Sequence, residues 1–201
     1  MEISASDVKQ LREQTGAPMM DCKQALLESD GDFEKAVTYL RQKSLATVTK
    51  KAGRTTSDGL IAAYIHPGSK IGVMVELNCE TDFVARSDDF TTFTKIVAMH
   101  IAALNPQYIR REDVTPQVME SEKSIYREQA RQSGKPEKFW EKIISGRLEK
   151  FYAEVCLLEQ TYIKDDTRTV QEVLNELIAK LGENITIRRF ARYQLGETLS
   201  Q

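Results

Sequence analysis

The stretch that decides the fold is Ile71-Gly72-Val73-Met74-Val75-Glu76-Leu77-Asn78, a run rich in apolar and β-branched residues. Every second residue from Ile71 to Leu77 is apolar, which is the pattern of a strand with one buried face. A second apolar run covers 59–66, and Pro67-Gly68-Ser69-Lys70 joins the two runs with turn-forming residues. The sequence therefore predicts an antiparallel hairpin.

The stretch Asn78-Cys79-Glu80-Thr81-Asp82-Phe83-Val84-Ala85-Arg86 follows, where the second strand gives way to a helix. An aspartate at such a junction can accept amide hydrogen bonds from the first helical turn, so we expect Asp82 to cap the helix. Phe83 cannot cap, and its ring has to be buried either in this protein or in a partner. A large aromatic most often belongs to its own protein's core, so the residue types alone favour core packing for Phe83.

The rest of the core alternates helical patterns with one more strand. Apolar residues recur every three or four positions over 90–104, which predicts a helix packed on the sheet. Thr115-Pro116 is expected to open a helix that runs to about Gln132, in an otherwise polar region. Apolar stripes predict two further helices, over 139–154 and 170–181. Residues 184–197 alternate as a third strand. The expected fold class is α+β, with a small antiparallel three-stranded sheet packed with helices.

Residues 1–45 predict a three-helix bundle that serves as a partner-binding module. Residues able to cap precede the first and third helices, and Gly16-Ala17-Pro18 separates the first helix from the second. Met19 and Met20 cannot both face so small a core, and an exposed methionine offers a soft, adaptable contact. An equally good interpretation is that the methionine pair closes the bundle.

Residues 46–57 are expected to form a basic, polar linker to a core domain over 58–201. Gly53 interrupts any helix there, and β-branched polar residues surround it. Five basic residues occur between positions 41 and 57 without an acid: Arg41, Lys43, Lys50, Lys51 and Arg54. Charges on a flexible link are usually just solvated. The alternative is an RNA-binding accessory protein that uses residues 41–54.

Composition limits the class of protein. The chain has 201 residues, 41% hydrophobic and 29% charged, with a net charge of −2, so we expect an ordinary globular protein without a broad basic footprint. Met1-Glu2-Ile3-Ser4 is not a basic region followed by an apolar one, and no apolar run has membrane-spanning length. We therefore expect a cytoplasmic protein without membrane association.

Residues that could carry out catalysis are sparse. Cys22, Cys79 and Cys156 are far apart, odd in number and without a Cys-x-x-Cys pair, which argues against a disulfide framework or a zinc site. Neither a phosphate-binding glycine motif nor a nucleophile elbow occurs, so we expect no enzyme activity, no cofactor, no metal and no direct nucleotide binding. A small enzyme using His100 or Cys79 is a further alternative.

Three motifs resemble the bacterial elongation factor Ts family in its short form. Thr-Gly-Ala-Pro-Met-Met-Asp-Cys-Lys at 15–23 is similar to the family's N-terminal signature, although Pro18 stands where many members have glycine. Residues 78–86 resemble its second signature. Gly182-Glu183-Asn184-Ile185 and Arg188-Arg189-Phe190 are similar to family members near the end of the chain. The motifs follow the family's order and together span nearly the whole sequence.

The resemblance implies guanine-nucleotide exchange on elongation factor Tu, in its GDP-bound and nucleotide-free forms, during translation. The N-terminal module would be a ubiquitin-associated-type bundle that contacts the nucleotide-binding domain of that GTPase. Its contact residues would be Gly16, Pro18, Met19 and Met20. The residues that match those disturbing the partner's magnesium site are Thr81, Asp82, Phe83 and Val84.

The short form has a single hairpin-bearing core unit, which by resemblance would hold another domain of the same partner. One core unit alone leaves a sheet edge or an apolar face uncovered. We therefore also expect a second copy of the chain to cover that surface, as a homodimer.

Overall fold

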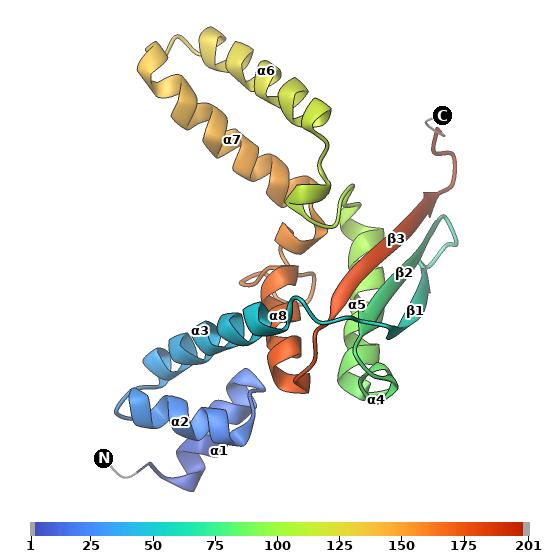
Figure 1. The fold of residues 1–201 in the computed structure, drawn as a ribbon. Coiled ribbons are helices and arrows are strands. Elements are labelled where there is room, and N and C mark those ends of the chain that lie inside the picture. The colour runs from blue at the N-terminus through green and yellow to red at the C-terminus, as the bar shows by residue number, and fades with distance from the viewer. Residues whose placement is uncertain (1–2, 199–201) are drawn as a thin grey trace. The chain divides into compact units, whose positions relative to one another are not determined.

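The structure is a computed structural model that describes residues 3–198. Its elements, in chain order, are α1 (Ala5–Thr15), α2 (Met19–Glu28), α3 (Phe33–Lys51), β1 (Asp58–Ile65), β2 (Ile71–Cys79), α4 (Asp82–Ala85), α5 (Asp88–Leu104), η1 (Arg111–Asp113), α6 (Pro116–Gln132), η2 (Glu137–Phe139), α7 (Trp140–Val155), η3 (Leu157–Glu159), α8 (Val170–Leu181) and β3 (Thr186–Gln194) (Figure 1). The strands form a sheet in the order β1-β2-β3. In the expected hairpin, His66 N donates to Ile71 O at 2.9 Å. The α+β prediction is confirmed.

The chain folds into two compact units, each built from three separate segments. Unit 1 contains the residues up to Ala62, together with Val75–Lys95 and Glu172–Arg188. Unit 2 contains Ala63–Met74, Ile96–Gln171 and the residues from Arg189 onward. The functional division of the chain at residues 45 and 57 stays a prediction.

The N-terminal helices of unit 1 begin where their capping residues predict. Ser4 Oγ accepts from Asp7 N at 3.1 Å while Asp7 Oδ2 accepts from Ser4 N at 3.2 Å, so the two residues form a capping box. Asp32 Oδ1 accepts from Lys35 N at 3.1 Å and caps α3. The three helices share a small apolar core formed by Val8, Leu11, Cys22, Ala25, Leu26, Ala36 and Leu40.

The expectation of a flexible linker over 46–57 is wrong for its first half, because α3 continues to Lys51. No glycine or proline occurs between Asp32 and Gly53, so the helix capped by Asp32 can propagate. Ser44 is buried, and its hydroxyl donates to Asn175 O of α8 at 2.9 Å, which anchors the middle of α3. The polar and basic residues up to Lys51 therefore lie on a helix and not on a flexible link.

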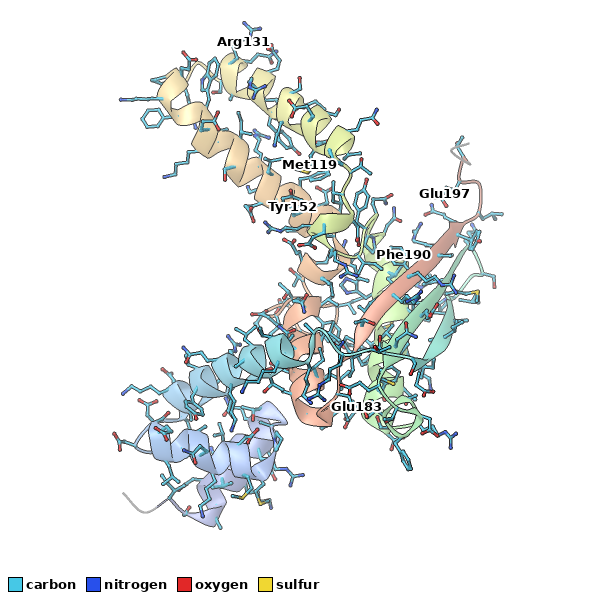
Figure 2. The ribbon with its side chains drawn as sticks, in the orientation of Figure 1. Met119, Arg131, Tyr152, Glu183, Phe190 and Glu197 are labelled. Atoms are coloured by element: carbon cyan, nitrogen blue, oxygen red, sulfur yellow. The ribbon has the colours of Figure 1, made fainter. Side chains whose placement is uncertain are left out.

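In unit 2, α6 and α7 lie side by side as a helical hairpin (Figure 1). Thr115 Oγ1 accepts from Val118 N at 3.4 Å, so α6 begins at the predicted Thr-Pro pair. Figure 2 shows Arg131 near the end of the hairpin where α6 leads into α7, and Tyr152 near the opposite end. There the guanidinium of Arg111 lies 4.4 Å from the Tyr152 ring centroid and bonds the carboxylates of both Glu149 and Glu159.

Candidate functional site

The junction between β2 and α4 is capped by a residue other than the expected one. Thr81 has an extended backbone, and its hydroxyl accepts from Val84 N at 3.5 Å, so Thr81 is the N-cap. The expectation that Asp82 caps the helix is wrong because Asp82 already lies inside it, at the first position. Its carboxylate instead pairs with Arg86, one turn later, at 3.1 Å.

Phe83 projects from α4 with 84% of its surface exposed, so the expectation of core packing is wrong. The helix has four residues and buries Ala85. Residues two positions apart on a helix differ in direction by about 200°, so the geometry that buries Ala85 turns Phe83 outward. The largest apolar side chain of this junction therefore lies on the surface, where a partner can contact it.

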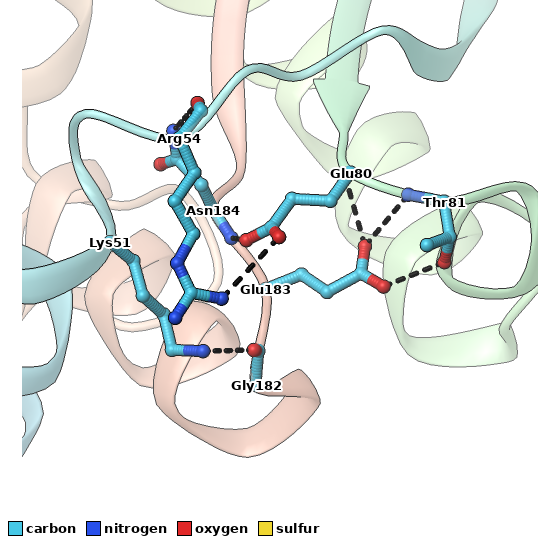
Figure 3. A network of polar contacts seen from close by, with 7 residues as sticks. All are labelled: Lys51, Arg54, Glu80, Thr81, Gly182, Glu183 and Asn184. Carbon is cyan, nitrogen blue, oxygen red and sulfur yellow. Dashed lines mark hydrogen bonds and ion pairs between the residues drawn. The ribbon is translucent and has the colours of Figure 1, made fainter.

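A network of polar contacts within unit 1 holds the backbone of this junction (Figure 3). Glu183 Oε2 accepts from the backbone N–H groups of Glu80 and Thr81, each at 3.0 Å, and Glu183 Oε1 accepts from Thr81 Oγ1 at 2.6 Å. In return, Glu80 Oε1 accepts from Asn184 N at 2.7 Å. Sequence reasoning placed Glu183 in a family motif without a role, because its partners lie about a hundred residues earlier.

Basic residues at the end of α3 and after it belong to the same network. Arg54 pairs with Glu80 at 3.4 Å, and its carbonyl accepts from Asn184 Nδ2 at 2.9 Å. The Lys51 ammonium donates to the carbonyl of Gly182. The hydrogen bond from Asn184 N, followed by the charge of Arg54, lowers the pKa of Glu80, so this carboxylate stays ionised at neutral pH.

These contacts weigh against the RNA-binding alternative. Lys43 forms an ion pair with Asp21 at 2.9 Å, and Lys51 and Arg54 are held in the network just described. Three of the five basic side chains thus make contacts within the protein, which leaves a weak positive field for a phosphate backbone.

The two side chains considered for enzyme chemistry are in structural environments. The buried Cys79 thiol donates to Thr81 O at 3.2 Å, and burial, with the nearby Glu183 carboxylate, raises the pKa of Cys79 to about 11. A thiol with this pKa is protonated at neutral pH and is a poor nucleophile. His100 is also buried, with both ring nitrogens hydrogen-bonded, to Gln160 Oε1 and Ile163 N, and burial lowers its pKa.

The predicted contact residues of the N-terminal module lie in the loop between α1 and α2 and at the start of α2. Gly16 ends α1 with a left-handed φ of 69°, and its N–H donates to Arg12 O at 2.8 Å. Pro18 precedes the first turn of α2. Met19 is 52% exposed and Met20 is 72% exposed, so the interpretation that this pair closes the bundle is wrong. The role of these residues as partner contacts stays a prediction.

The two sets of predicted contact residues lie in separate parts of unit 1: one in the α1–α2 loop and the first two residues of α2, the other at the start of α4. Within residues 3–198, no cluster of three or more His, Cys, Asp or Glu side chains is arranged to hold a metal ion. None of the helices described is both long and apolar enough to cross a membrane.

Comparisons with known proteins agree along the whole chain. The family described as elongation factor TS matches residues 8–197. Elongation factor Ts of Geobacter metallireducens is 61% identical over 201 residues, covering 100% of this chain and 93% of that protein. Elongation factor Ts of Moorella thermoacetica is 60% identical over 199 residues, covering 99% of this chain and 98% of that protein. The chain therefore belongs to the elongation factor Ts family.

Proposed function

We propose that this protein accelerates GDP release from elongation factor Tu by inserting Phe83, with Asp82 beside it, next to the partner's magnesium site. Family membership supports the general role, a guanine-nucleotide exchange factor in translation elongation. The observation that carries the finer proposal is Phe83 itself, an aromatic ring 84% exposed on a junction whose backbone is held by a network of hydrogen bonds. Such a role is carried out in the cytoplasm, where ribosomes work.

The proposed mechanism involves no bond chemistry on this chain. In GTPases, Mg²⁺ bridges the nucleotide phosphates to the protein, so a disturbed magnesium shell weakens nucleotide binding. A ring inserted beside that site stabilises the form of the partner that binds nucleotide poorly. Because the coupling is reciprocal, GDP or GTP weakens the binding of the factor by the same ratio, and the factor leaves after exchange.

The N-terminal module contributes affinity in this proposal. Met19 and Met20 present flexible, polarisable side chains that adapt to the surface of the partner's nucleotide-binding domain. Burying one such side chain contributes about 1.5–3 kcal/mol of binding free energy. The module thus holds the GTPase while Phe83 acts on the magnesium site.

Stopped-flow release of fluorescently labelled GDP from purified elongation factor Tu tests the proposed function. We expect the release rate to rise with the concentration of this protein and to reach a plateau. Excess unlabelled nucleotide should then dissociate the complex. A release rate that stays at the intrinsic value at every concentration would exclude the proposal.

Homodimerisation is a second proposal, carried by the sheet face in unit 2. His66 pairs with Ile71 across the turn, so Ile65 and Met74 lie on the same face of β1 and β2, and both are exposed. An apolar face of this kind is suited to a second copy of the chain. Sedimentation velocity over a range of concentrations should show a dimer, and Met74→Glu should shift it to the monomer.

A further inference from the structure

We propose that Glu183 is a positioning residue for nucleotide exchange: its carboxylate fixes Thr81, and through Thr81 the backbone that presents Phe83. The inference rests on the proposed function of Phe83. Glu183 follows α8, whereas Thr81 precedes α4, so the contact joins segments 102 residues apart in sequence (Figure 3).

The carboxylate of Glu183 takes both hydrogen-bond donors of Thr81. One oxygen accepts from Thr81 N at 3.0 Å and from Glu80 N at 3.0 Å, and the other accepts from Thr81 Oγ1 at 2.6 Å. Bonds to an ionised acceptor are stronger than bonds between neutral groups. Thr81 therefore has its position fixed by a side chain outside its own helix.

The hydroxyl of Thr81 passes this constraint on to α4. Its single hydrogen points to Glu183, so the lone pairs of the oxygen are left to accept from Val84 N at 3.5 Å. The carbonyl of Thr81 accepts from Cys79 Sγ and from Ala85 N, each at 3.2 Å. Phe83 lies between Thr81 and Val84, so its backbone is held on both sides.

Glu183 is itself held in place, so it can serve as a fixed support. Gly182, with a left-handed φ of 75°, ends α8 and donates from its N–H to Ile178 O at 2.9 Å. On the other side, Asn184 N donates to Glu80 Oε1 at 2.7 Å. The segment 80–81 and the segment 183–184 thus each accept a backbone hydrogen bond from the other. We call this pair of contacts the clamp.

The need for this clamp follows from the size of α4. A helix of four residues has no stability of its own, because helices shorter than about 12 residues are marginal in water. An exposed aromatic on a loose segment would lose conformational entropy on insertion into a partner. A segment already ordered in the free protein avoids that cost, which is the benefit of preorganisation.

The experiment measures GDP release at saturating factor for Glu183→Ala, Phe83→Ala and the double variant. We expect Glu183→Ala to lower the plateau rate by roughly tenfold, the size expected for residues coupled in one hydrogen-bond network. In the Phe83→Ala background the same substitution should change the rate little, because there is no ring left to position. Equal slowing in both backgrounds, or no slowing in either, overturns the inference.

Ser44→Ala is the matched control, because it removes another hydrogen bond between distant segments of unit 1 without touching Thr81. It should leave the plateau rate unchanged. Backbone hydrogen exchange gives a readout independent of the partner: amides of residues 81–85 should exchange faster in Glu183→Ala and not in Ser44→Ala. Unchanged exchange at these amides in Glu183→Ala also overturns the inference.

Glu183→Gln provides a second variant if the alanine variant does not fold. Its amide keeps the size of the side chain but has one acceptor oxygen in place of two. The same loss of plateau rate, dependent on Phe83, is expected at smaller amplitude. If Phe83→Ala itself exchanges like the unmodified protein, the proposed function fails; if Phe83→Ala is slow and both Glu183 variants are normal, this inference alone fails.

Discussion

Phe83 and Phe90 are seven residues apart and have opposite surroundings: the ring of Phe83 is 84% exposed, whereas that of Phe90 is fully buried. Both belong to unit 1 and both follow the same strand. Phe90 lies on α5, which is long enough to bury a whole stripe of apolar side chains. The four-residue helix α4 buries Ala85. One ring therefore contributes to stability, and the other is available for binding.

Substituting these two phenylalanines should separate function from stability. Phe83→Ala should change the free energy of unfolding by less than about 0.5 kcal/mol, because an exposed ring contributes little to the core. It should slow GDP release from elongation factor Tu. Phe90→Ala should lose about 3–5 kcal/mol of stability. Urea unfolding and stopped-flow nucleotide release measure the two effects, and an unfolded Phe83→Ala would show that the ring is structural after all.

Substituting the exposed methionines should weaken affinity rather than the limiting rate. Met20→Ala should raise the concentration of factor needed for half-maximal GDP release by roughly tenfold, since it removes buried contact area worth about 1.5 kcal/mol or more. The plateau rate should stay the same because Phe83 is intact. Leu45→Ala is the control, because Leu45 is also an exposed apolar residue and lies on α3 of the same module. A lower plateau with Met20→Ala would contradict the division of roles.

The fold could be predicted in large part because its signals are local. The alternation in β2 and the turn before it set the hairpin, and capping residues mark the starts of α1, α3 and α6. The continuation of α3 to Lys51 was missed for a physical reason. Its polar and basic composition is typical of a solvated linker. The hydrogen bond that anchors it, from Ser44 to Asn175 O, joins positions 131 residues apart.

The candidate site could be predicted in its residue types and less well in its geometry. An acid beside an aromatic at a strand–helix junction was visible, but exposure of Phe83 depends on how few residues α4 has. Capping by Thr81 in place of Asp82 depends on where the helix begins, which composition alone does not set. Glu183 carried no local signal, because a glutamate after a helix is usually solvated and its partners are far away in sequence.

Gly59 should tolerate no side chain, in contrast to Gly53. A Cβ on Gly59 would lie 2.1 Å from the carbonyl oxygen of Leu77 in the neighbouring strand, and its φ of 149° is unfavourable for other residues. Gly59→Ala should therefore cost about 3 kcal/mol, combining backbone strain and overpacking. A Cβ on Gly53 meets nothing within 4 Å, so Gly53→Ala should be close to neutral. Thermal unfolding compares the two, and equal melting temperatures would contradict the steric argument.

His100 should make stability depend on pH near neutrality. Ile163 N–H can only donate, so Nδ1 of His100 accepts, at 3.3 Å, and the hydrogen on Nε2 is donated to Gln160 Oε1 at 2.9 Å. Protonation of Nδ1 would break the first bond and place a charge in the core. Burial, opposed in part by the bond to Gln160, lowers the pKa of His100 below its ordinary value of 6.5.

The sign of the effect follows from proton uptake by the two states. Below pH 6.5 the unfolded chain binds a proton at His100 that the folded chain does not. The free energy of unfolding therefore decreases as the pH is lowered from 6.5 to the pKa of the folded state, by at most about 1.4 kcal/mol per pH unit. Urea unfolding between pH 7.5 and 5 should show this slope. His100→Gln should flatten this slope, whatever the stability of the variant itself. An unchanged slope in His100→Gln would assign the titration to another group.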